Sequence, residues 1–133
     1  MRKDERIERC RELKASKSCS QAVALSFGDL TGLSDEILEH ACEGFSSGMC
    51  TTCGTCGALT GAALVAGMAL GTKEGTRGAT AEIMKRFTER NGTTICRELK
   101  GLDGLGVRRS CEDCCADAAE FLSEALESRG VKL

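Results

Sequence analysis

Apolar residues recur at intervals of three and four along most of this chain, which is the spacing of amphipathic helices. Polar residues that favour helix starts and glycines that favour helix ends separate these segments. We expect helices over residues 3–16, from Ser18 to about Leu30, from Ser34 through Phe45, over 57–71, from beyond Gly78 to Asn91, from Thr94 through Leu99, and from Ser110 to about Arg129. Glycine-punctuated loops are expected over residues 44–54 and 101–106.

The helix expected over residues 3–16 is highly charged and has only a thin apolar line, formed by Ile7, Cys10 and Leu13. A narrow apolar stripe buries little surface, so we expect this helix to lie across the outside of the bundle.

Two later helix starts resemble capping boxes, in which a cap hydroxyl and a side chain three residues on satisfy free backbone amides. They are Ser18 with Gln21 and Ser110 with Asp113.

The segment from Gly57 to Gly71 carries no charge and is expected to form a buried helix. Gly57 and Gly61 are four residues apart, as are Gly67 and Gly71, so each pair lies on one helical face. Glycine weakens a helix by about 1 kcal/mol relative to alanine. We therefore expect both pairs to let other backbones approach closely, and we place this helix at the centre of the bundle.

The composition determines the fold class. There is no proline to interrupt helices, and β-branched residues are sparse. Aromatic residues make up 3% of the chain, with no Trp or Tyr, so the core must be built from Ala, Leu, Val, Met, Phe and Cys. We predict an all-α fold: a compact bundle of about five or six helices in a single cysteine-rich domain over residues 1–133.

Charge and targeting signals exclude several classes of protein. The net charge is −2, and the segments rich in Lys and Arg are equally rich in Asp and Glu, which is typical of solvated helix faces and not of nucleic-acid binding. The charged N-terminus is not followed by an apolar stretch, so no signal peptide is expected. The run over 57–71 is too short and too rich in glycine to span a bilayer. We expect a cytoplasmic protein without membrane insertion.

Ten cysteines in a reducing compartment favour metal or redox chemistry over a disulfide scaffold. Cys50, Cys53 and Cys56 are separated by two-residue gaps just before the buried helix. Thiolates are soft ligands and nucleophiles, and this spacing lets neighbouring sulfurs converge on one ion or cluster.

Four cysteines are expected in the first turn of four different helices: Cys19, Cys56, Cys96 and Cys111. They follow the cap candidates Ser18, Thr55, Thr94 and Ser110. Free amides and the positive end of the helix dipole stabilise a thiolate there, so we expect lowered thiol pKa values. If these helix starts converge, the four sulfurs share one electropositive pocket. The alternative is that cysteine, as a small apolar residue, fills core positions there.

The same cysteines carry a resemblance to the C_GCAxxG_C_C family of redox-active proteins. The matching segments are Cys19 in Cys-Ser-Gln-Ala, Gly44-Phe45 with Gly48-Met49, Cys56-Gly57-Ala58-Leu59-Thr60-Gly61, Cys96 in Cys-Arg-Glu-Leu, and Cys111 ahead of Asp117-Ala118-Ala119. The match spans about residues 18–125. It implies an all-helical fold, a redox or iron–sulfur role and a prokaryotic source. A related domain is associated with an iron–sulfur cluster in a multi-centre electron-transfer cytochrome.

The chain departs from the family pattern by having more cysteines than it requires. Cys50 and Cys53 fall where relatives tend to carry glycine or other small residues, and the further additions are Cys10, Cys42, Cys114 and Cys115. The set of four ligands is therefore open. The run from Cys50 to Cys56 resembles part of a ferredoxin motif but lacks its last cysteine and its proline. No Cys-x-x-Cys-His motif for haem attachment is present.

Two Cys-x-x-Cys pairs, Cys53 with Cys56 and Cys111 with Cys114, lie at helix starts as in dithiol oxidoreductases. No surrounding βαβ pattern supports a thioredoxin fold. Cys114 and Cys115 diverge by about 100° on a helix, so at most one of them should face Cys111. Arg108 and Arg109 could lower the pKa of Cys111, although a solvated loop is the favoured interpretation of this pair.

Three functions remain open. The preferred one is a redox or electron-transfer protein that holds an iron–sulfur cluster through Cys19, Cys56, Cys96 and Cys111, with Cys50 and Cys53 as alternates. The second is a metal-free thiol–disulfide protein or sensor that uses one of the Cys-x-x-Cys pairs. The third is a structural zinc or metal-carrier site, since Cys₄ sets are typical of zinc.

The partners are less well defined. An oxidoreductase component is compatible with the sequence, but catalysis is not established by it. A redox partner protein is expected, and the glycine-rich helix could also pack against a copy of itself in a homodimer.

Overall fold

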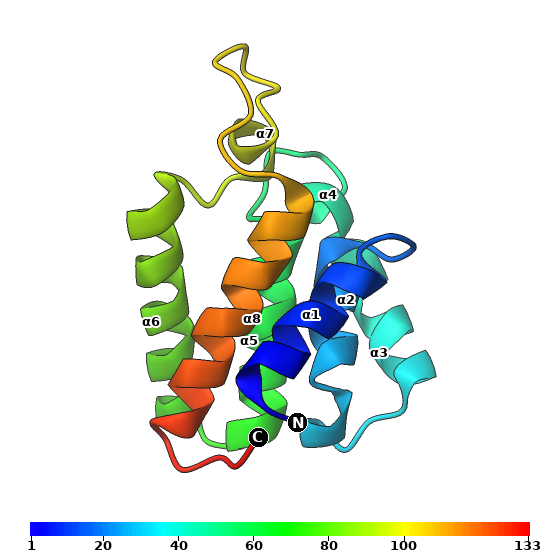
Figure 1. Ribbon diagram of the computed structural model, residues 1–133, viewed down its shortest axis with the longest axis vertical. Helices are drawn as coiled ribbons and strands as arrows, with labels where there is room; N and C mark the ends of the chain where they lie inside the picture. The colour runs from blue at the N-terminus through cyan, green and yellow to red at the C-terminus, as the bar shows by residue number, and fades with distance from the viewer.

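The computed structural model describes residues 1–133 and is built only of helices, as predicted (Figure 1). The α-helices are α1 (Lys3–Leu13), α2 (Cys19–Ser26), α3 (Asp35–Cys42), α4 (Ser46–Met49), α5 (Gly57–Leu70), α6 (Lys73–Asn91), α7 (Cys96–Leu99) and α8 (Cys111–Glu127). Two short 3₁₀ turns, η1 (Gly28–Leu30) and η2 (Glu43–Phe45), adjoin α2 and α3. The only strand-like pairing is one isolated bridge between Thr55 and Ile95.

Helices α5 and α8 lie side by side (Figure 1). Helix α5 packs against α2, α6 and α8, and helix α8 packs against α1, α2, α5 and α6. The core they enclose is made largely of alanine, leucine, cysteine and three phenylalanines, Phe27, Phe87 and Phe121. Small side chains at these contacts let the helix axes approach closely.

The first glycine pair of α5 has the expected role. A Cβ atom at Gly61 would lie 2.6 Å from the Ser20 carbonyl oxygen, and one at Gly57 would lie 3.2 Å from the Ser20 amide nitrogen. The backbone of α2 therefore occupies the face of α5 that this pair presents. This contact sets the distance between α5 and the start of α2, where Cys19 lies.

The second glycine pair does not have this role. A Cβ atom at Gly67 would meet only the Thr76 methyl group at 3.7 Å, and one at Gly71 would meet nothing within 4 Å. Gly71 instead ends α5 in the left-handed conformation, with φ of +67°, which favours glycine at helix C-termini. The expectation of a second close backbone contact was wrong, because a four-residue spacing does not separate a packing face from a helix end.

Several helix boundaries also differ from expectation. Helix α6 begins at Lys73, before Gly78, because the Thr72 hydroxyl caps it by accepting the Gly75 amide. Helix α2 ends at Ser26, before Leu30, and the chain continues through the turn η1. The expected loop over residues 44–54 contains the single turn α4.

Helix α1 is less superficial than its narrow apolar stripe indicated. Arg6 and Cys10 are completely buried against the rest of the bundle. The Arg6 guanidinium binds both oxygens of Asp29, at 2.8 and 2.9 Å, and donates to the Ser26 and Leu133 carbonyls. It also lies over the Phe27 ring, 4.9 Å from its centre. A buried arginine requires such partners, and they come from sequence-distant segments that periodicity does not reveal.

Candidate redox site

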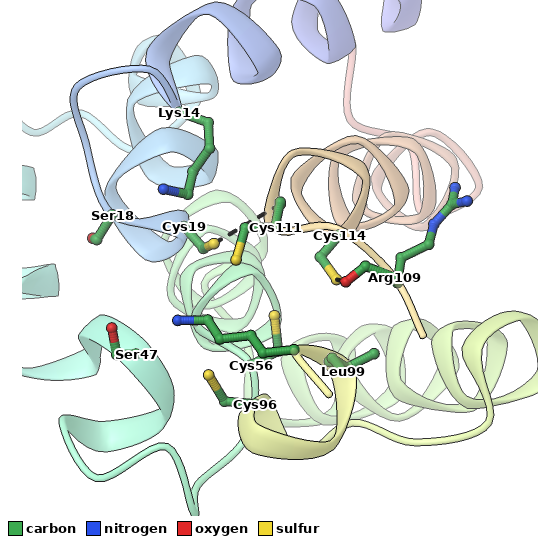
Figure 2. Close-up of a pocket in the computed structure, with 12 residues that line it drawn as sticks. Lys14, Ser18, Cys19, Ser47, Cys56, Cys96, Leu99, Arg109, Cys111 and Cys114 are labelled. Atoms are coloured by element: carbon green, nitrogen blue, oxygen red, sulfur yellow. Dashed lines mark hydrogen bonds between the residues drawn. The ribbon is translucent and has the colours of Figure 1, made fainter. Parts of the chain in front are cut away.

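The four cysteines expected at helix starts line one cavity of about 60 Å³. Figure 2 shows their sulfur atoms directed toward a common space between the ends of α2, α5, α7 and α8. The remaining lining residues are Lys14, Ser18, Ser47, Gly57, Leu99, Lys100, Arg109 and Cys114.

Three of the four cysteines are the first residues of their helices. Cys19 follows the cap Ser18, whose hydroxyl accepts the Gln21 amide in the predicted capping box. Cys111 follows Ser110, which accepts the Asp113 amide. Cys96 also opens its helix, although Ile95 and not Thr94 precedes it as the cap residue.

Cys56 differs from these three, because it is itself the residue that precedes the first turn of α5. Thr55 therefore does not cap that helix, contrary to expectation, and pairs with Ile95 in the isolated bridge instead. The Cys56 amide donates to the Thr94 carbonyl at 2.8 Å. The Cys96 amide donates to the Gly54 carbonyl at 2.9 Å. These bonds hold two cysteine-bearing segments beside each other.

The segment before Cys56 has an unusual backbone. Ser47, Met49, Cys50 and Thr52 all have φ near +50 to +60°, a conformation that side chains other than glycine rarely adopt. Gly48 lies among them with φ of +61°, and a Cβ atom there would lie 2.5 Å from the Cβ of Cys96. Such strained residues persist where the surrounding structure holds them, and they cluster at functional sites. Here they wrap the chain tightly around Cys96.

The thiols in the cavity are neighbours that affect one another's pKa. The Cys19 thiol is affected by those of Cys111 and Cys56, and the Cys56 thiol by that of Cys114. The Cys19 thiol also points at the Cys111 carbonyl, 3.9 Å away (Figure 2). Cys96 has no such neighbour and lies closer to Lys100. Four thiols therefore form a group of neighbours, namely Cys19, Cys56, Cys111 and Cys114, and Cys96 lies at the edge of this group.

These contacts raise the pKa values of the thiols. Contact with Cys114, supported by burial, raises the pKa of Cys56 to about 12. Contact with Cys19 and burial raise the pKa of Cys111. For Cys19, contact with Cys111 lowers the pKa, but contacts with Cys115 and Cys56 together with burial outweigh it, so the net direction is upward. Burial also raises the pKa of Cys96, although Lys100 opposes it.

The expectation of lowered pKa values at these helix starts was therefore wrong for the metal-free protein. A helix terminus offers amides and a partial positive charge, but those effects are modest. Thiols in contact and out of water cannot all ionise, since each thiolate would repel the next. A positive ion or cluster placed among them would reverse this balance.

The cavity carries positive charge and no carboxylate. Lys14 and Lys100 both lower the pKa of Cys111, and Lys100 lowers that of Cys96, so both ammonium groups act on the thiols. Figure 2 shows the guanidinium of Arg109 directed away from the cysteines. The two lysines are therefore the cations available to an anionic group in the cavity.

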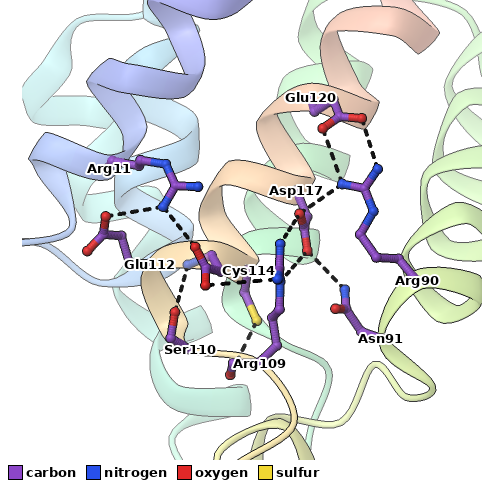
Figure 3. A network of polar contacts seen from close by, with 10 residues as sticks. Arg11, Arg90, Asn91, Arg109, Ser110, Glu112, Cys114, Asp117 and Glu120 are labelled. Carbon is purple, nitrogen blue, oxygen red and sulfur yellow. Dashed lines mark hydrogen bonds and ion pairs between the residues drawn. The ribbon is translucent and has the colours of Figure 1, made fainter.

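Arg109 is held by Asp117, a buried carboxylate on α8 (Figure 3). Its guanidinium binds both Asp117 oxygens, at 2.9 and 3.0 Å. Arg90 and Asn91 of α6 donate to the same carboxylate, at 2.9 and 3.1 Å. The backbone carbonyl of Arg109 is in turn the closest acceptor for the Cys114 thiol, at 4.0 Å. This network fixes the turn that precedes Cys111.

Asp117 was expected only as part of the family match, with no role assigned to it, and Arg109 was expected to be a solvated loop residue. A usable signal exists, because Asp117 is a lone charge within the run from Cys114 to Ala119, which is otherwise apolar. A carboxylate in such a run must find partners inside the fold.

The remaining cysteines fall into two groups. Cys50 and Cys53 are exposed and do not line the cavity. Cys10, Cys42 and Cys115 are completely buried. Adjacent Cys114 and Cys115 diverge as expected, since only Cys114 lines the cavity.

All ten cysteines are free thiols. Of the two Cys-x-x-Cys pairs, Cys111 and Cys114 both line the cavity. In the other pair, Cys53 is exposed while Cys56 is buried.

No three side chains of the metal-binding types are arranged around a single point so as to bind one ion directly. The donor set itself is soft and buried, which suits iron–sulfur clusters, zinc and thiol exchange alike. The structure contains no helix that is both long enough and apolar enough to cross a bilayer.

Comparison with known protein families gives a match that includes these cysteines. The family described as "Putative redox-active protein (C_GCAxxG_C_C)" matches residues 17–125, most of the chain. No curated protein and no solved structure matches this chain. The matched region contains every cysteine that lines the cavity and excludes Cys10. The chain thus belongs to the C_GCAxxG_C_C family of redox-active, cysteine-rich proteins.

Proposed function

We propose that this protein is an electron-transfer protein that binds an iron–sulfur cluster through Cys19, Cys56, Cys96 and Cys111. The observation that carries the proposal is that four sequence-distant helix starts each deliver one thiol to the same small cavity. Four cysteine thiolates are the usual ligand set of such clusters. When bound, the cluster would supply a centre that takes up and releases electrons.

The spread of the sulfurs supports a cluster over a single zinc ion. Zinc binds four thiolates at about 2.3 Å from one centre, so all four sulfurs must surround one point. No three potential ligands do so here. In a [4Fe–4S] cluster each thiolate binds a different iron, so the four ligand sulfurs need not surround one point. Cys96, which stands apart from the thiols in mutual contact, fits the second arrangement.

The surroundings of the cavity support an anionic occupant. Ligand thiols must lose their protons, which their raised pKa values disfavour until a metal replaces the protons. The thiolates and sulfides then carry net negative charge, which Lys14 and Lys100 offset. Free amides at the starts of α2 and α8 can donate to the sulfurs, and such bonds tune a cluster's reduction potential.

The test is to purify the protein without oxygen and measure its visible spectrum, iron and acid-labile sulfide. We expect a brown protein with iron and sulfide in simple ratio to the chain. Cys56→Ser should abolish the colour after reconstitution, whereas Cys53→Ser should retain it, because Cys53 is exposed outside the cavity. Loss of the cluster in Cys53→Ser would instead make Cys53 a ligand. A colourless protein with one tightly bound zinc would refute the proposal.

A second function is favoured by one specific observation. Cys19 and Cys111 are in thiol contact, and both are partly accessible at the mouth of the cavity. In a metal-free protein these two cysteines are the pair best placed for thiol–disulfide exchange. If no metal binds after reconstitution, mild oxidation should remove thiols in twos, beginning with this pair. A redox partner protein is proposed in either case.

A further inference from the structure

A second pair of thiols lies beneath the cavity, between α1 and α8. Cys10 and Cys115 are both completely buried and do not line the cavity. The two thiols are in contact, and the Cys10 thiol also lies 3.5 Å from the Cys115 carbonyl oxygen, within reach of a weak hydrogen bond. Cys10 lies outside the region that matches the family. The site described above therefore does not account for this pair.

Cys19 connects the buried pair to the cavity. The Cys115 thiol is in contact with the Cys19 thiol, and its sulfur lies 3.9 Å from the Cys19 carbonyl oxygen. Cys19 is in turn in contact with Cys111 at the mouth. Each thiol from Cys10 through Cys115 to Cys19 is thus directed at the carbonyl oxygen of the next cysteine, in a row that ends at the partly accessible Cys111. By contrast Cys42 is equally buried, and burial alone raises the pKa of its thiol.

We propose that Cys10 and Cys115 are a second redox centre, a buried dithiol that is oxidised to a disulfide by exchange through Cys19. Thiol–disulfide exchange passes from sulfur to sulfur by direct attack, so it requires contact at each step and no access of the oxidant to the buried pair. The row from Cys10 through Cys115 and Cys19 to Cys111 suits that requirement. Because Cys10 and Cys115 are buried, they need Cys19 as a relay, a thiol that passes the disulfide inward from Cys111.

The exchange balances with a low-molecular-weight disulfide as the oxidant. Cys111 attacks this disulfide and releases one thiol, and Cys19 then displaces the second thiol to give a Cys19–Cys111 disulfide. Cys115 attacks the Cys19 sulfur and releases Cys111, and Cys10 attacks the Cys115 sulfur and releases Cys19. Two thiols of the protein are oxidised to one disulfide, and one small disulfide is reduced to two thiols.

The relay also predicts how the two centres interact. With the proposed cluster bound, Cys19 is a ligand and cannot exchange, so the buried pair stays reduced. In the metal-free protein the relay is open. This second redox centre can be tested without the cluster, so its failure is distinguishable from failure of the proposed function.

The test uses metal-free protein incubated with oxidised glutathione, with samples alkylated over time and disulfides mapped by peptide mass spectrometry. We expect Cys19–Cys111 to appear first and Cys10–Cys115 to replace it. In Cys19→Ser the Cys10–Cys115 disulfide should fail to form, whereas Cys42→Ser should behave as the unmodified protein does. Absence of a Cys10–Cys115 disulfide in the unmodified protein, or its equal formation in Cys19→Ser, would overturn the proposal.

A second variant keeps the test informative if Cys19→Ser folds poorly. In Cys115→Ser the relay has no acceptor, so the Cys19–Cys111 disulfide should accumulate and Cys10 should remain a thiol. Oxidation of Cys10 in this variant to the same extent as in the unmodified protein would also overturn the proposal. Cys42 reports folding internally, because its completely buried thiol is alkylated only when the protein opens.

Discussion

Replacing Gly61 by alanine should destabilise this protein, although alanine is the better helix former. The added Cβ atom would lie 2.6 Å from the Ser20 carbonyl oxygen and 3.0 Å from the Ser20 Cα. The first distance is 0.8 Å shorter than an ordinary contact of 3.4 Å. Both atoms belong to the backbone of α2, so no side chain can rotate away and the whole helix must shift.

The magnitude follows from a comparison within α5. Gly67→Ala gains the helix propensity of alanine, about 1 kcal/mol, and meets only the Thr76 methyl at an ordinary 3.7 Å. Gly61→Ala gains the same propensity but also overpacks, which costs about 1–3 kcal/mol. The free energies of unfolding of the two variants should therefore differ by about 1–3 kcal/mol, with Gly67→Ala the more stable.

Urea unfolding of both variants, followed by circular dichroism, measures this difference directly. In a thermal unfolding experiment, each kcal/mol of difference in the free energy of unfolding should shift the midpoint by about 4 °C for a chain of this size. A functional effect is also expected, since moving α2 moves Cys19 away from Cys56 and should lower iron loading in Gly61→Ala alone. Equal stability of the two variants would refute the role assigned to Gly61.

Three further outcomes are expected. Gly48→Ala should displace Cys96 and lower iron loading, since the new Cβ atom would lie 2.5 Å from the Cβ of Cys96, whereas Gly44→Ala meets nothing within 4 Å and should load normally. Asp117→Ala should reduce the free energy of unfolding in urea by about 2–3 kcal/mol, because its buried carboxylate accepts four hydrogen bonds. Surface substitutions change this free energy by up to about 0.5 kcal/mol, so a loss within that range would contradict the role of Asp117. The metal-free protein should lose stability as the pH rises above about 9, because thiols such as Cys56, whose pKa is raised to about 12 in the folded state, stay protonated while those of the unfolded chain ionise. Urea titrations between pH 8 and 10.5 check the last expectation, and Cys56→Ser should show a weaker decline.

The positions of the site residues could be predicted from local patterns. Cys19 and Cys111 follow serine caps, and a cap fixes the helix start to within a residue. Cys56 and Cys96 joined the set through the cap candidates Thr55 and Thr94, which do not cap those helices, and the family resemblance supports the same set. The sequence did not separate Cys114, which lines the cavity, from Cys53, which does not. That choice depends on the path of the chain around α4, where several residues adopt the left-handed conformation.

The chemical state of the site could not be predicted from sequence. The expected fall in thiol pKa rested on helix starts taken one at a time, whereas the rise in the structure comes from thiols on different helices that touch. Arg6 and Asp117 were missed for a related reason. Their partners, Asp29 for one and Arg90 for the other, are more than twenty residues away in the chain. Periodicity locates a face of a helix but does not identify what that face meets.

The cavity takes one wall from residues before 20 and another from residues beyond 110, and this has a consequence for biosynthesis. A ribosome releases the segment that bears Cys111 long after the one that bears Cys19, so no partial chain can present all four proposed ligands together. Acquisition of the proposed cluster must therefore follow synthesis of the chain through Cys111. In cells short of iron the newly made protein would accumulate with its thiols unliganded, in the form whose proposed sulfur relay is open.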